Sequence, residues 1–262
     1  MAKGQEKGED SGDEEKTSRQ RCWRQKFFVP PNDCSQFHPG TVDLSPGWFM
    51  NRREVCTTIL CRISFLITGN SQRLEDPLVV SADLRTSAGA NYIRRVAHAE
   101  LLHNAILCLV CPSLYHKGSE AVSRVLSGNV VLQHHQNADL WGSAFSAWQL
   151  IVNRRTPRHR DMGAAPTMYD LLTSAGTYTR AHLDVHDLGA RFLYSPGTVV
   201  ALSGKTLLHE VKHWEGGERI CIAHYFRDNV HNRLNIPRPC WPVRDDTYLK
   251  YMSQAFKQRH QL

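Results

Sequence analysis

The stretch TVVALSGKTLLHEVKHWEGGERICIAHYF, residues 198–226, decides the fold of this chain. It alternates short runs of branched and aromatic residues with Ser-Gly-Lys and Glu-Gly-Gly-Glu turns, a pattern typical of consecutive β-strands. Similar runs occur at 145–154, 178–185 and 191–194. Many short strands at this spacing indicate a sandwich or barrel. We therefore expect an all-β core with flanking helices, built as a double-stranded β-helix (jelly roll).

The first half of the chain has a different pattern. Residues 91–111 carry apolar side chains at three- and four-residue steps, which predicts a helix that ends before Pro112. The expected buried positions of this helix are Ile93, Ala97, Leu101, Ala105 and Cys108. We divide the chain into a disordered tail at 1–20, an N-terminal extension with helices packing on the core at 21–140, the double-stranded β-helix at 141–240 and a C-terminal segment at 241–262.

Two histidines and an aspartate stand at the ends of predicted strands. His159 and Asp161 follow the run at 145–154, and His209 lies within residues 198–226. Residues two apart on an extended chain project to the same side, so His159 and Asp161 can bind one ion together. Two neutral imidazoles and one carboxylate on one face of Fe(II) leave positions open for a bidentate 2-oxo acid and O2. We predict this iron site and prefer His209 to the competing His213, because Val211 and Arg219 follow His209 at suitable positions.

Arg219 opens the last predicted strand, whose alternation can be followed. If Arg219 points into the barrel, then Cys221, Ala223, Tyr225 and Arg227 point inward too. A guanidinium beside the metal can form a bidentate, charge-assisted pair with the distal carboxylate of 2-oxoglutarate. The sequence therefore predicts Arg219 as the anchor of this cosubstrate.

Arginines crowd around His159. Arg154, Arg155, Arg158 and Arg160 all lie within five residues of it, and Arg154 is a second candidate for the cosubstrate carboxylate. Residues 1–20 carry four basic and six acidic side chains, which gives this segment a net charge of −2. Because the whole chain has a net charge of +7, the remaining residues carry +9. A basic body favours polyanionic partners, and the arginines near the metal could hold a phosphate backbone.

Several other classes of protein and site are disfavoured. No run approaches the roughly 18 apolar residues needed to span a bilayer, and the N-terminus is charged, so we expect a soluble intracellular protein without a membrane partner. The eight cysteines are interpreted as reduced thiols. Cys108 and Cys111, near His103, have the spacing of a zinc site, but their apolar surroundings favour buried structural thiols. Cys56 and Cys61 are no stronger as metal ligands, and His134 with His135 is expected in a solvent-exposed loop.

Residues 145–239 resemble the TET/JBP group of 2-oxoglutarate and iron(II)-dependent nucleobase dioxygenases, in particular its compact fungal members. The resemblance rests on NRRTPRHRDMGA at 153–164, LGARFLYSPGT at 188–198, LLHEV at 207–211 and GERICIAHYFRD at 217–228. It implies oxidation of the methyl group of a DNA base that is flipped out of the duplex. It also implies DNA as partner, nuclear residence and a role in DNA demethylation, with no obligate protein partner evident.

The resemblance also implies substrate residues. Tyr225, six positions past Arg219, corresponds to the aromatic residue that stacks on the flipped base. Arg227, followed by Asp228, stands where relatives often have a histidine that binds the base edge, and Ala164 replaces an acidic residue of some relatives. The implied substrate is 5-methylcytosine, oxidised to 5-hydroxymethylcytosine or further, with N6-methyladenine as a second candidate. Two alternatives stay open: the same chemistry on another substrate (an alkylated base or a protein side chain), and a catalytically silent jelly-roll binding module.

Overall fold

The computed structural model describes residues 27–30, 36–49, 78–127, 132–133 and 136–240. The predictions for the tail at 1–20, the segment at 241–262, Cys56, Cys61, His134 and His135 lie outside these residues. The helices are α2 (Ser87–Val110), α3 (Pro112–Leu126), η1 (Ala138–Leu140), η2 (His186–Leu188) and α4 (Asp228–Arg233). The strands are β1 (Gly40–Leu44), β2 (Trp48–Phe49), β3 (Leu78–Val79), β4 (Leu132–Gln133), β5 (Ala147–Val152), β6 (Thr156–His159), β7 (Asp170–Gly176), β8 (His182–Val185), β9 (Ala190–Leu193), β10 (Val199–Leu202), β11 (His209–Val211) and β12 (Arg219–Tyr225).

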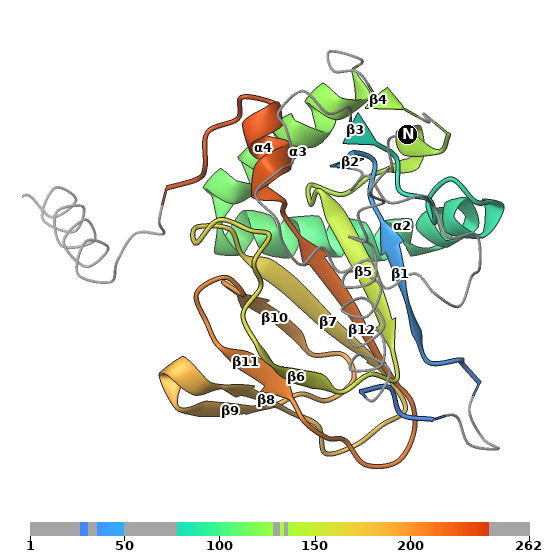
Figure 1. The fold of residues 1–262 in the computed structure, drawn as a ribbon, viewed down its shortest axis with the longest axis vertical. Coiled ribbons are helices and arrows are strands. Elements are labelled where there is room, and N and C mark those ends of the chain that lie inside the picture. The colour runs from blue at the N-terminus through green and yellow to red at the C-terminus, as the bar shows by residue number, and fades with distance from the viewer. Residues whose placement is uncertain (1–26, 31–35, 50–77, 128–131, 134–135, 241–262) are drawn as a thin grey trace, which may run out of the picture.

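Two antiparallel sheets form the core (Figure 1). The larger sheet has the strand order β1-β5-β12-β7-β10, and the smaller has the order β6-β11-β8-β9. Between them lies an apolar cluster that includes Leu183, Tyr194 and Trp214 from the smaller sheet and its loops, packed against Leu172 and Val200 of the larger sheet. Non-consecutive strands are therefore neighbours in both sheets, and the predicted double-stranded β-helix is confirmed. The edge strand β1 comes from the region 21–140.

Strand β7 is an interior strand of the larger sheet that sequence patterning missed. It runs between β12 and β10 and is central to the larger sheet. Its first residue is the buried Asp170, and Ser174 is buried as well. Because polar residues occupy buried positions here, β7 lacks the alternation of apolar and polar residues that marks a strand with one solvated face.

Helices α2 and α3 cover the outer face of the larger sheet, with α2 crossing behind it in Figure 1. Helix α2 starts at Ser87, not at residue 91 as predicted, because the Thr86 hydroxyl accepts a hydrogen bond of 3.0 Å from the Gly89 N–H and caps the first turn. It ends before Pro112, as expected, and this proline then begins α3, which was not predicted. Among the described helices, none has the length and apolarity required to cross a membrane.

The predicted buried face of α2 was wrong except at Ile93. Ala97, Leu101 and Ala105 are exposed, Leu101 by 66%, and Cys108 is only partly buried. The buried face instead includes Glu100, His103 and Leu107. Polar residues point inward because they meet a polar partner on the sheet, so apolar spacing alone pointed to the wrong side of the helix.

That partner is His224, on the outer face of β12. One oxygen of Glu100, Oε1, accepts hydrogen bonds from His103 Nδ1 at 2.8 Å and from His224 Nε2 at 2.7 Å. The Thr173 hydroxyl lies 2.9 Å from the other ring nitrogen of His103. The three side chains could also hold a metal ion by composition. Their separations are those of direct hydrogen bonds, so we interpret the cluster as a network that joins α2 to the sheet.

We expect Glu100→Gln to lower the free energy of unfolding at pH 7 by about 3 kcal/mol. Burial raises the pKa of Glu100, but the hydrogen bonds from His103 and His224 outweigh it and lower the pKa from 4.5 to about 2. A carboxyl with a depressed pKa stabilises the fold above its unfolded-state value and loses that contribution as pH falls through the folded-state value. Glutamine imitates the neutral carboxyl, so the difference between variant and wild type should shrink below about pH 4.5. Urea unfolding at pH 7 and at pH 3 measures it, and a difference that is constant with pH would contradict the charged network.

Candidate active site

The structure brings His159, Asp161 and His209 together. Strand pairing places His209 directly opposite His159, and Asp161 lies just past the end of β6. His159 Nε2 is 3.4 Å from Asp161 Oδ1, and His209 Nε2 is 3.8 Å from Asp161 Oδ2. These separations exceed those of the Glu100 network and leave room for an ion between the donor atoms. Two nitrogens and one carboxylate oxygen make a donor set that fits Fe(II).

Each histidine is oriented by its own strand. The Nδ1–H of His159 donates to the Pro157 carbonyl at 2.9 Å, and the Nδ1–H of His209 donates to the Leu207 carbonyl at the same distance. With Nδ1 protonated, the lone pair of each neutral ring sits on Nε2, which faces the aspartate. The local backbone thus selects the tautomer that a metal ligand requires.

Electrostatics around the triad favour a bound cation. Burial and the neighbouring His159 lower the pKa of His209, which keeps that ring neutral. Burial alone would raise the pKa of Asp161, but the two imidazoles outweigh it and lower the pKa, so the carboxylate stays ionised. A second carboxyl, Asp170, lies close by, and burial together with the charge of Asp161 raises its pKa well above the usual range.

Arg219 is buried at the start of β12, with an exposure of 2%. Its Nη1 donates to the Arg154 carbonyl at 3.1 Å, and its guanidinium lies 5.4 Å from the Tyr194 ring centroid and 5.8 Å from that of Trp214. Within the described part of the chain no carboxylate pairs with it, and its Nε has no hydrogen-bond partner. A buried guanidinium without an anion is costly, so the site is suited to an anionic ligand.

Arg154, the second candidate for binding the cosubstrate carboxylate, lies just past the end of β5, where its carbonyl accepts the hydrogen bond from Arg219. Its backbone forms a bridge with Phe28, and its side chain is partly buried. Burial lowers the pKa of His159, but the neighbouring Asp161 outweighs it and raises the pKa. The positive charge of Arg154 opposes this rise only weakly, which places the Arg154 side chain near the triad. The structure therefore brings both arginines to the region of the predicted metal ligands.

The residues assigned to the substrate lie at the other end of β12. The guanidinium of Arg227 stacks on the Tyr225 ring, 4.5 Å from its centroid. The charge of Arg227 helps to lower the pKa of Asp161, and a Cβ on Gly163 would collide with the Arg227 side chain. Asp228 is held by Arg238 through bonds of 2.7 and 2.6 Å. Tyr225 and Arg227 thus form one stacked unit beside the metal ligands, whereas Asp228 already has a cationic partner.

Sequence reasoning missed three polar residues of the barrel interior. Gln149 Nε2 donates to Asp43 Oδ1 at 2.8 Å, and burial raises the pKa of Asp43 to about 7. Asp170 is buried, and neither carboxyl oxygen has a hydrogen-bond partner among the described residues. A Cβ at Gly204 would collide with the carboxylates of both Asp161 and Asp170, so only glycine fits there. Only the register of β1, β5 and β7 brings these residues to the site, and no motif signals them.

The remaining candidates lie away from the metal ligands or on the surface. His213 is exposed beyond the end of β11 and is not part of the cluster. Cys111 is buried and Cys108 partly buried, and no described histidine or acid joins them in a possible metal cluster. Arg155 and Arg158 are exposed, while Arg160 donates twice to the Asp187 carboxylate at 2.9 Å.

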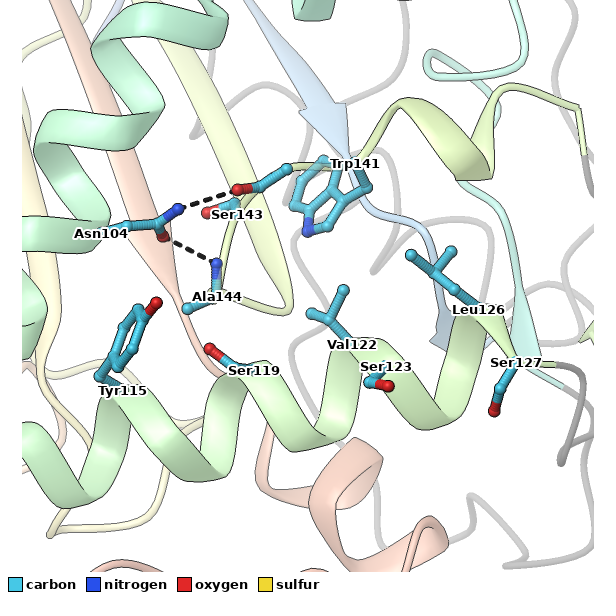
Figure 2. A pocket seen from close by; sticks show the side chains of 11 residues that line it. Asn104, Tyr115, Ser119, Val122, Ser123, Leu126, Ser127, Trp141, Ser143 and Ala144 are labelled. Carbon is cyan, nitrogen blue, oxygen red and sulfur yellow. Dashed lines mark hydrogen bonds between the residues drawn. The ribbon is translucent and has the colours of Figure 1, made fainter.

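A cavity of about 560 Å³ lies away from this site. It lies between α3 and the segment before β5, where Asn104 bonds the Gly142 carbonyl at 2.8 Å and the Ala144 N–H at 2.9 Å (Figure 2). Its lining residues include Tyr115 and Trp141 but no histidine, cysteine or acid. The cavity therefore offers packing and hydroxyl groups without catalytic chemistry.

Comparisons with known proteins agree with this geometry. The Tet_JBP family, described as the oxygenase domain of the 2OGFeDO superfamily, matches residues 69–228, and the resemblance seen in the sequence is confirmed. No curated protein matches. Among solved structures, NgTET1 in complex with 5mC DNA is similar with 16% identity and a TM-score of 0.46, over 68% of this chain and 64% of that chain.

Two other solved structures show weaker similarity. A cupin 2 conserved barrel domain protein from Salinispora arenicola CNS-205 is 18% identical over 34% of this chain and 69% of that one, with a TM-score of 0.25. Ectoine synthase from P. lautus is 13% identical over 38% and 67%, with a TM-score of 0.22. The family match covers more than half of the chain, so the protein belongs to the Tet_JBP family and contains an oxygenase domain of the 2OGFeDO superfamily, an enzyme class that uses Fe(II), 2-oxoglutarate and O2.

Proposed function

We propose that this oxygenase hydroxylates the methyl group of a modified DNA base, first of all 5-methylcytosine to 5-hydroxymethylcytosine, with N6-methyladenine as a second substrate. The observation that carries the proposal is the stacked Tyr225–Arg227 pair beside Asp161. A flat aromatic ring covered by a planar guanidinium offers a stacking surface and hydrogen-bond donors at one place. Recognition of a flipped purine or pyrimidine base requires both a stacking surface and hydrogen-bonding groups. The proposed substrate also implies residence in the nucleus of a eukaryotic cell.

In this proposal His159, Asp161 and His209 hold the iron, and Arg219 binds the distal carboxylate of 2-oxoglutarate. Bound iron would supply the oxidation of a C–H bond by dioxygen, coupled to decarboxylation of the 2-oxo acid. The Arg219 guanidinium is buried and positioned before the cosubstrate binds, so little conformational entropy of the protein is lost on binding. Arg154 lies close enough to help neutralise the anion.

Tyr225, Arg227 and Asp228 are assigned to the base. Arg227 is a donor-only group, and cytosine presents acceptors at O2 and N3 on the edge that pairing normally occupies. Asp228 is bound to Arg238 and is the first residue of α4. In this proposal it either helps to position α4 beside the base or binds the base after the bond to Arg238 has broken. The buried Asp43–Gln149 pair and Asp170 would line the inner part of the same pocket and offer groups to an exocyclic amine.

The test is mass spectrometry of nucleosides after incubation of methylated duplex DNA with protein, Fe(II) and 2-oxoglutarate. We expect 5-hydroxymethylcytosine, formed together with succinate and absent when either small molecule is omitted. Parallel reactions with N6-methyladenine DNA, with alkylated bases and with peptides identify the preferred class. Succinate release with peptides alone would contradict the proposal, and no succinate with any substrate would favour a silent binding module.

Tyr225→Ala should lower kcat/KM on methylated DNA by about tenfold, because base–aromatic stacking contributes roughly 1–3 kcal/mol. Tyr225→Phe keeps the ring and should stay close to wild type. Iron binding, followed by metal analysis of the purified proteins, should be unaffected, since Tyr225 is not among the grouped donor residues. Equal kinetics for the alanine variant and wild type would rule out the stacking role.

A further inference from the structure

Met162 is a large apolar side chain placed in solvent beside the metal ligands. It directly follows Asp161 and is 74% exposed. Among the described residues only Leu109, on the opposite face of the larger sheet, is a more exposed large hydrophobic residue. Exposure on this scale contributes nothing to the core, so the side chain is available to a partner.

The segment around Met162 is held at the rim of the site. Lys205 Nζ lies 3.4 Å from the Met162 carbonyl and 3.9 Å from its sulfur. The residue before Lys205 is Gly204, which packs against the carboxylate of Asp161. On the other side, Gly163 packs against Arg227 and accepts a hydrogen bond of 3.1 Å from the Asp228 N–H. Met162 therefore stands between a lysine and the stacked Tyr225–Arg227 pair.

Lys205 contacts this apolar side chain, and two arginines precede it within four residues in the chain. Arg158 and Arg160 are exposed on the strand that leads into the segment, and Arg160 is fixed by Asp187 and by the Thr206 carbonyl at 2.9 Å. An apolar tip flanked by lysine and arginine fits a nucleic acid duplex, where phosphates attract the cations and base steps admit an apolar wedge. A peptide or a small substrate would need no such combination.

We propose that Met162 enters the duplex and fills the space left by the flipped base, while Lys205 and Arg158 bind the flanking phosphates. This inference rests on the proposed function. Flipping costs unstacking and unpairing, a few kcal/mol, and an inserted side chain restores part of the lost stacking. Methionine suits the role because it is unbranched, flexible and polarisable. Its position next to a ligand residue puts the wedge where the vacated step must lie for the base to reach the metal.

The inserted Met162 side chain, called the wedge below, is needed only where stacked base pairs must be separated. The experiment therefore compares one methylated oligonucleotide as duplex and as single strand. Met162→Ala should lower kcat/KM on the duplex about tenfold and on the single strand less than about threefold. Met162→Leu should retain most of the duplex activity, and Met162→Gln, similar in length but polar, should not. Leu109→Ala, at an apolar residue on α2 that is even more exposed, is the matched control and should behave as wild type.

A second readout does not depend on turnover. With 2-aminopurine next to the target base in the duplex, binding of the iron-free protein should raise fluorescence, and Met162→Ala should reduce that rise at saturation. Equal losses on duplex and single strand, or no loss on either, would overturn the wedge and leave the proposed function standing. A wild-type protein that oxidises single strands but not duplexes would also overturn the wedge and leave the proposed function standing. Absence of wild-type activity on any methylated DNA would overturn both.

Discussion

Asp161→Ala is expected to abolish iron binding and turnover together. The carboxylate supplies the only acidic donor of the triad, and its two oxygens face one histidine each, at 3.4 and 3.8 Å. Partners that merely hydrogen-bond a metal ligand contribute roughly 10–100-fold to affinity or activity, so loss of a ligand should exceed that range. Metal analysis after dialysis against Fe(II) and the succinate assay measure the two effects.

The iron-free variant should remain folded. Asp161 and Asp170 both pack against Gly204, so removing one carboxylate relieves their repulsion, which offsets the lost interactions of Asp161 with His159 and His209 and should keep the unfolding midpoint of the iron-free protein close to wild type. Asp139→Ala, an exposed acid on η1, is the matched control and should keep iron and activity. Full iron occupancy in Asp161→Ala would contradict the assigned ligand set, and unfolding of the variant would point to a structural role instead.

Arg219→Met is expected to weaken 2-oxoglutarate binding by roughly 10- to 100-fold, because a hydrogen bond to a charged group contributes about 1.5–3 kcal/mol. Arg219→Lys keeps the charge but loses the planar fork, so its affinity should fall between the two. The affinities follow from thermal shifts with Mn(II) in place of iron and increasing 2-oxoglutarate, a measurement without turnover.

The same substitution should stabilise the protein when no ligand is present. Arg219 is buried without a carboxylate partner in the described chain, and replacing an uncompensated buried charge by an apolar side chain removes its desolvation cost. The control is Arg191→Met, an exposed arginine bound to Asp184 at 2.6 Å, which should leave cosubstrate affinity unchanged. A ligand-free Arg219→Met protein that melts well below wild type would show that the guanidinium serves the fold rather than the cosubstrate.

The sequence predicted the fold, and it pointed to the three side chains that the structure brings together, because both depend on short local patterns. The run of strands and turns at 198–226 predicted the antiparallel core, and β11 and β12 form within it. His159 and Asp161 are two residues apart, and His209 is the histidine paired with β6. Arg219 was found in the same way, since its strand could be followed residue by residue.

What could not be predicted depends on partners distant in the chain. The buried face of α2 depends on the hydrogen bond between Glu100 and His224, which lies 124 residues later in the chain. The spacing of apolar residues along the helix carries no information about that partner. Strand β7 escaped detection because Asp170 and Ser174 are polar and buried. Asp43 and Gln149 meet only through the register of β1 with β5. The polar lining of the pocket, which should decide the substrate, is therefore a product of tertiary structure.

The backbone bonds that orient His159 and His209 have a consequence for divergence within the family. Each ring is anchored to the carbonyl two positions upstream, so its alignment needs no help from any side chain elsewhere in the barrel. Substitutions in the pocket wall can then accumulate without tilting the imidazoles. A lineage with this arrangement can change what it oxidises while the orientation of the two imidazoles is kept.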